Sequence, residues 1–113
     1  MIHDEIVTYE VAKLAKEKGF DVPTAKNYRH ENGATCNAPT QNLLQRWLRE
    51  EKGVVVEVMC LPTTRTSSKY EYKRHIFWGS DGHYIEGEYG DEIFDTYELA
   101  LEDALIYALE NLV

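Results

Sequence analysis

The strongest structural constraint in this chain lies at its C-terminal end. Residues 97–112 repeat apolar side chains at helical spacing, which predicts an amphipathic helix with Thr96 as its N-cap. The apolar stripe is wide and continuous, and it consists of Ala100, Leu101, Ala104, Leu105, Ala108, Leu109 and Leu112. Because so broad an apolar surface has to be covered, we expect this helix to lie across a sheet.

Two further segments predict helices. Residues 8–20 start at Thr8, a good N-cap, and carry a narrow apolar stripe. Residues 40–53 start at the N-cap Thr40 and close at Gly53, which suits the left-handed position at a helix end. Short helices are marginal in water on their own, so both are expected to pack on other elements.

Three segments of the second half predict strands. Residues 54–61 are short and rich in β-branched side chains, residues 68–78 alternate, and residues 83–89 give a weaker signal. Gly79-Ser80-Asp81-Gly82 has the composition of a turn, so the strands are expected to form an antiparallel meander. The sequence thus predicts an α+β fold in the order α-α-β-β-β-α, with helices packed on one face of a three-stranded sheet.

The segment between the first two helices has no clear period. Residues 21–39 hold two prolines and Asn32-Gly33, which predicts a loop. At this length the loop either stays irregular or contains a short strand pair around Asn27–Tyr28 and Ala34–Cys36.

Length and composition predict one domain over residues 1–113. The chain is 43% hydrophobic and 28% charged, which is typical of a folded protein. No apolar run approaches the roughly 18–20 residues of a membrane span, and the acidic N-terminus does not resemble a secretory signal. We therefore expect a cytoplasmic protein without a membrane partner. Its two cysteines, Cys36 and Cys60, match no disulfide or metal pattern and are expected to be reduced.

The net charge of −8 is carried by the second half of the chain. Residues 57–113 hold twelve acidic and four basic residues, and Asp81 to Asp103 includes nine carboxylates with no Lys or Arg. Such a surface repels phosphate backbones and anionic membranes, so nucleic acid is not expected as a partner. It is compatible with a basic protein partner, although the simplest interpretation is that it keeps the protein soluble.

No catalytic constellation is visible. The dinucleotide, P-loop, nucleophile-elbow, HExxH and CxxC patterns are all missing, and the acidic cluster lacks calcium-loop spacing. His30 and Cys36 lie in the same loop, but nothing positions them as a nucleophile pair. We therefore expect no catalytic residues, no metal ligands and no cofactor, and classify the chain as a non-enzymatic protein.

The most distinctive exposed feature expected from the sequence is an aromatic strand face. Tyr70, Tyr72 and Trp78 fall on one side of the strand over residues 68–78. Together with the acidic half, they favour an interaction module that binds a basic protein or self-associates. Two alternatives stay open: an acidic effector that mimics nucleic acid, and a small enzyme with its site in the loop over residues 21–39.

The element order over residues 40–112 is compatible with a double-stranded-RNA-binding topology. Such domains carry lysines at the start of the final helix to grip phosphates. This chain has carboxylates there, namely Asp91, Glu92, Asp95 and Glu98. The likeness is therefore one of topology, and RNA binding is not expected.

Three stretches carry a resemblance to a known family. Val11–Phe20, Ala38–Glu50 and Thr96–Glu102 resemble a family of small uncharacterised proteins of gut bacteria and of their phages or prophages. The likeness spans nearly the whole chain, and Pro39–Glu50 is its most specific part. The family has no activity to carry over, so no residue inherits a role. The resemblance implies a bacterial or mobile-element setting and an intracellular product.

Overall fold

The computed structural model describes residues 5–29, 33–62, 70–78, 86–90 and 92–113. In these ranges the chain forms three helices and five strands. In chain order these are α1 (Tyr9–Glu17), β1 (Asn27–Arg29), β2 (Thr35–Asn37), α2 (Gln41–Lys52), β3 (Val54–Pro62), β4 (Tyr70–Trp78), β5 (Glu86–Tyr89) and α3 (Tyr97–Asn111).

The α+β class is confirmed, and its strands form two antiparallel sheets. One sheet pairs β1 with β2, and the other pairs β3, β4 and β5 in that order. The predicted order α-α-β-β-β-α is wrong, because the β1–β2 pair lies between α1 and α2 and a simple meander does not describe the whole chain. The segments joining β3 to β4 and β4 to β5, including the turn predicted at Gly79–Gly82, lie outside the described residues.

Threonine caps define where the three helices start. Thr8, Thr40 and Thr96 each adopt extended backbone angles, and each side chain accepts a hydrogen bond from the backbone N–H three residues later. This satisfies a donor that the first turn leaves without a partner. Gly53 ends α2 in the left-handed region, with φ of 68°. The predicted helix boundaries are therefore confirmed at these positions.

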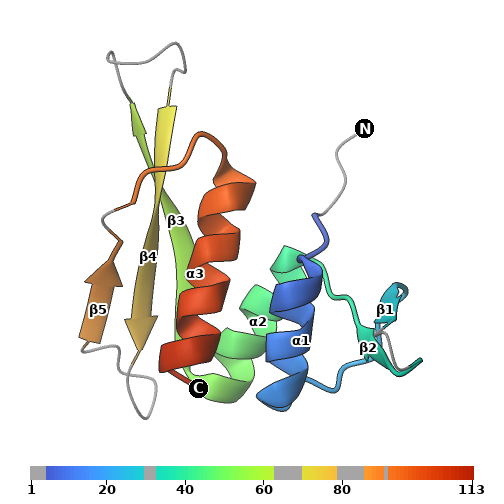
Figure 1. Ribbon diagram of the computed structural model, residues 1–113. Coiled ribbons are helices and arrows are strands. Elements are labelled where there is room, and N and C mark those ends of the chain that lie inside the picture. The colour runs from blue at the N-terminus through green and yellow to red at the C-terminus, as the bar shows by residue number, and fades with distance from the viewer. Residues whose placement is uncertain (1–4, 30–32, 63–69, 79–85, 91) are drawn as a thin grey trace.

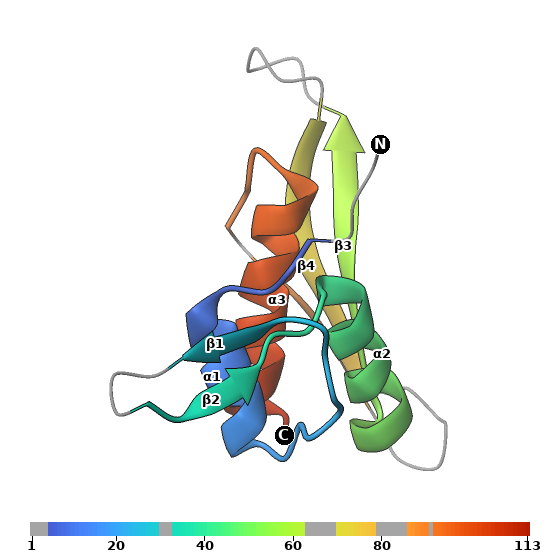
Figure 2. The same cartoon turned by 90° about the vertical axis from the view of Figure 1, so that its right-hand side faces the viewer.

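Helix α3 occupies the middle of the molecule (Figure 1). It packs on β3 and β4 on one side, and α1 and α2 also contact it. The β1–β2 pair lies on the opposite side of α1 from the larger sheet (Figure 1), and in the turned view it passes in front of α1 (Figure 2). Contacts from several directions account for the wide apolar stripe of α3. Its fully buried residues are Ala100, Leu101, Ala104, Leu105, Ala108 and Leu109.

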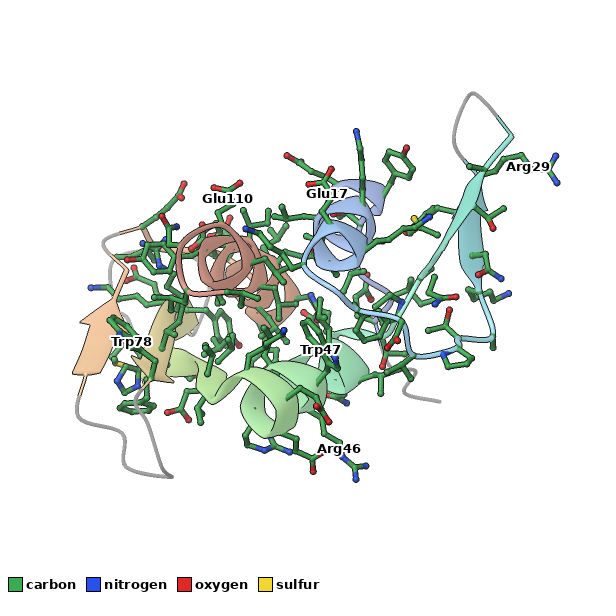
Figure 3. The ribbon with its side chains drawn as sticks, turned by 90° about the horizontal axis from the view of Figure 1, so that it is seen from below. Glu17, Arg29, Arg46, Trp47, Trp78 and Glu110 are labelled. Carbon is green, nitrogen blue, oxygen red and sulfur yellow. The ribbon has the colours of Figure 1, made fainter. Side chains whose placement is uncertain are left out.

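The core joins the larger sheet to the helices. Val54 and Val56 of β3 and Ile76 of β4 are buried members of this core. Trp47 of α2 points into the space among the helices (Figure 3), where its ring meets that of Phe20 edge to face at 5.3 Å. Burial of each such large side chain contributes about 1.5–3 kcal/mol, so this cluster fixes α2 and α3 on the sheet.

Candidate functional site

Exposed apolar side chains gather at the start of α3. Among the described residues, four large hydrophobic side chains are exposed, and three of them belong to Glu92–Leu99. Ile93 is 45% exposed, Tyr97 42% and Leu99 54%, while the fourth, Tyr9, lies on α1. Single exposed apolar residues are ordinary, but a concentration of them marks interaction sites. We call Glu92–Leu99 the acidic-apolar segment.

The backbone of the acidic-apolar segment is held against β4. Phe94 exchanges two hydrogen bonds with Tyr72, at N–O distances of 2.9 and 3.1 Å. The Tyr97 ring meets the Tyr72 ring edge to face, with 6.2 Å between centroids. Thr96 caps α3 by accepting from the N–H of Leu99 at 3.2 Å. The exposed apolar groups are therefore presented on a positioned backbone, beside the end of α3 that Figure 1 shows next to β4.

Carboxylates alternate with these apolar groups. Glu92, Asp95 and Glu98 are all exposed, and the chain has no Lys or Arg after Arg74. Glu98 lies in the first turn of α3, where the positive end of the helix dipole favours a negative charge. The segment thus combines apolar area with a negative potential, which suits a partner that is both apolar and basic.

The aromatic face predicted from the sequence lies toward α3. Ile76, which shares this face, is fully buried, and Trp78 is half-buried against the core. The ring of Tyr72 packs on Tyr97 of α3. The side chain of Tyr70 lies outside the described residues. Tyr72 and Trp78 are thus partly buried by contacts within the chain, and the interaction role of Tyr70, Tyr72 and Trp78 stays a prediction.

Arg74 completes the contact between this face and α3. Its guanidinium donates to the Asp103 carboxylate at 2.7 Å and lies 4.3 Å from the centre of the Tyr107 ring. Both groups of the ion pair are mostly shielded from solvent, with side chains 18% and 24% exposed. The backbone of Gly90 runs against the Arg74 side chain. Arg74 therefore links β4, α3 and the chain after β5.

Glu102 is a half-buried carboxylate that the sequence did not single out. It accepts hydrogen bonds from the backbone N–H of Thr8 at 3.3 Å, from the Thr8 hydroxyl at 3.2 Å and from Gln41 Nε2 at 3.3 Å. Burial raises the pKa of Glu102, and these hydrogen bonds oppose the rise only in part. Thr8 is the N-cap of α1 and Gln41 is the first residue of α2, so Glu102 links α3 to the starts of both helices.

A cleft of about 560 Å³ opens at the C-terminal end of α1, beside β2. It is lined by Lys16, Gly19, Phe20, Asp21, Thr35, Cys36 and Asn37. Several of these residues belong to the segment 21–39, in which the sequence analysis places the site of a possible small enzyme. Cys36 is a free thiol and is 3% exposed, and His30 lies outside the described residues.

In the described part of the chain, no three His, Cys, Asp or Glu side chains come together in a group able to hold a metal ion. Cys36 and Cys60 are both free thiols, one buried and one exposed. Part of the acidic stretch, including Asp81 and Asp91, lies outside the described residues. The candidate sites are thus the acidic-apolar segment and the cleft beside β2.

Comparison of the chain with protein-family models, with curated proteins and with solved structures finds no match. The resemblance to proteins of gut bacteria and phages therefore stays a prediction. Among the described residues, no helix has the length and apolar character needed to cross a membrane.

Proposed function

We propose that this protein is a non-enzymatic interaction module that binds a basic protein partner through the acidic-apolar segment. One observation carries the proposal: three exposed apolar side chains alternate with three exposed carboxylates over Glu92–Leu99. The bonds to Tyr72 hold this backbone in place, so a partner meets a surface that is already ordered. Pre-organisation of this kind lowers the entropy cost of association.

The chemistry of the segment selects among partner classes. Its carboxylates attract basic side chains and repel the phosphates of nucleic acids and anionic lipids. A second copy of the chain would bring the same carboxylates together, so this surface does not favour self-association. A basic protein segment with a few apolar residues matches both features. Because the segment is short, we expect a small interface and a complex that weakens with salt.

The apolar groups also separate this proposal from a nucleic-acid mimic. A mimic needs carboxylates that replace phosphates, and its binding would depend on charge alone. Exposure of Ile93 and Leu99 among the carboxylates favours a protein surface instead. From the sequence resemblance we also propose that the protein acts in the cytoplasm of a bacterium, either as a host or as a prophage product.

The test compares apolar variants inside and outside the segment. The probe is a labelled amphipathic helical peptide built from Lys and Leu, and fluorescence anisotropy measures its affinity. The double variant Ile93→Ser/Leu99→Ser should bind about tenfold more weakly, because it loses the apolar part of the contact. Tyr9→Ser removes the exposed large side chain of α1 and should bind as the wild type does. Equal affinity of the double variant would refute the proposal.

A charge variant completes the test. Glu98 and Glu110 are both exposed carboxylates, one in the first turn of α3 and one near its last turn. Glu98→Gln should weaken peptide binding more than Glu110→Gln, although both remove one negative charge. Equal losses would mean that the peptide responds to net charge, and the acidic-apolar segment would lose its role as the binding site.

A further inference from the structure

The cleft beside β2 has an uncovered strand edge as one wall. In the antiparallel β1–β2 pair, Asn27 lies opposite Asn37 and Tyr28 opposite Cys36. The N–H of Ala38 donates to the carbonyl of Lys26 at 3.0 Å, so Ala38 directs its N–H toward β1. Backbone groups alternate in direction along a strand. Asn37 and Thr35 therefore direct their N–H and C=O groups away from β1.

A contact from α1 supports this assignment. Lys16 Nζ donates to the carbonyl oxygen of Thr35 at 3.1 Å, from the side of β2 opposite to β1. Lys16, Thr35 and Asn37 all line the cleft. The outward backbone groups of β2 thus open into the cleft, and Lys16 covers only the carbonyl of Thr35.

Beyond the end of β2, backbone groups of Pro39 and Gln41 already pair with an N-terminal segment of the chain. The N–H of Val7 donates to the carbonyl of Pro39 at 3.0 Å, and the N–H of Gln41 donates to the carbonyl of Glu5 at 2.7 Å. These bonds flank an antiparallel bridge between Ile6 and Thr40. This N-terminal segment, residues 5–7, stops pairing at Thr8, where α1 begins. The edge at Asn37 is the next position along, and it faces the cleft.

The remaining walls suit one apolar side chain between two charges. Phe20 and Cys36 are among the lining residues and are 4% and 3% exposed, so they supply a small apolar patch. Lys16 and Asp21 are exposed at the rim and carry opposite charges. The cleft volume of about 560 Å³ is within the range of pockets that hold ligands.

The geometry points to a peptide-binding site: the cleft takes an extended segment of another polypeptide, which adds as a strand to β2 through the N–H and C=O of Asn37. An apolar side chain of that segment packs against Phe20 and Cys36. Strand addition of this kind derives affinity from backbone hydrogen bonds and specificity from a side-chain pocket. Helix α1 contacts β2 and flanks this edge, so a slender extended chain fits better than a second folded copy. This site is separate from the acidic-apolar segment.

Two proline variants form a matched pair for the test. Asn37→Pro removes the N–H that faces the cleft, and Asn27→Pro removes the N–H of the residue directly opposite, at the outer edge of β1. Neither N–H group forms a hydrogen bond within the β1–β2 pair, and proline is tolerated where a strand N–H faces outward. Thermal unfolding confirms that each variant folds. The probe is a capped hexapeptide of alternating Thr and Val, titrated into ¹⁵N-labelled protein.

The expected result is local to the cleft. The hexapeptide should shift the amide signals of Thr35 and Asn37 and slow the hydrogen exchange of the Asn37 amide. Asn37→Pro should bind about tenfold more weakly, whereas Asn27→Pro should bind as the wild type does. Equal binding by Asn37→Pro, shifts confined to other surfaces, dimerisation of the protein through β2, or no shift at saturating peptide would each overturn the proposal.

Discussion

At the scale of single residues, Glu102 shows how a charge is kept in a partly apolar setting. Burial raises the pKa of Glu102, and hydrogen bonds from Gln41 and Thr8 lower it by a smaller amount. Because the folded pKa lies above the unfolded one, the folded state takes up a proton at Glu102 more readily. Glu102 therefore contributes its full stabilisation at pH values below its unfolded pKa, and this contribution is lost as the pH rises through the higher folded pKa.

Glu102→Gln should remove this pH dependence. The amide keeps an oxygen that accepts from Thr8 or Gln41, and it carries no charge to desolvate. Relative to the variant, the wild type should lose stability as pH rises from acidic values toward neutrality. Urea unfolding across that range measures the difference, with Glu110→Gln as the control for loss of one exposed carboxylate. A constant difference at all pH values would contradict the role given to Glu102.

At the scale of elements, much of the secondary structure was predictable because its signals are local. Each helix begins after a threonine whose side chain caps the first turn, and α2 ends at Gly53. β3 and β4 coincide with the β-branched and alternating segments. The strand pair β1–β2 was only an open alternative, because strands of three residues are too short to show a period.

The covered face of the sheet was not predictable from alternation. Apolar side chains occur on both faces of β4: Ile76 is fully buried, while Phe77 on the other face is half-buried beside His75, with 4.0 Å between ring centroids. Tyr72 and Trp78 follow Ile76 toward α3. Only the tertiary packing of α3 decides between the two faces.

The contact between β4 and α3 can be tested at Gly90. A Cβ added there would lie 2.7 Å from Cγ of Arg74, so Gly90→Ala should displace Arg74 from Asp103 and Tyr107. We expect a loss of about 1–3 kcal/mol in the free energy of unfolding, measured with urea. Gly87→Ala is the matched control, because its Cβ would meet Phe77 at an ordinary distance of 3.6 Å. Similar effects of both variants would contradict the account of Arg74.

At the scale of the whole molecule, sequence predicted the sign of the charge but not the site. The acidic second half was visible directly, and carboxylates ahead of the last helix were expected. The sequence alone does not reveal that these carboxylates lie among exposed Ile93, Tyr97 and Leu99. Leu99 is exposed, whereas its neighbours Ala100 and Leu101 are buried. Linear spacing does not reveal which apolar residues of a mostly buried helix stay exposed. The cleft beside β2 depends likewise on how α1 packs against a short strand pair.

The central claim is that a basic partner docks on the acidic-apolar segment. An amide-shift titration of ¹⁵N-labelled protein with the Lys/Leu peptide at low salt tests it most directly. We predict saturable shifts concentrated on Glu92–Leu99 and on Tyr72, which is bonded to it, with reversal of the shifts at high salt. Shifts spread over distant carboxylates such as Glu50, Glu51 and Glu110, or confined to them, would contradict the account.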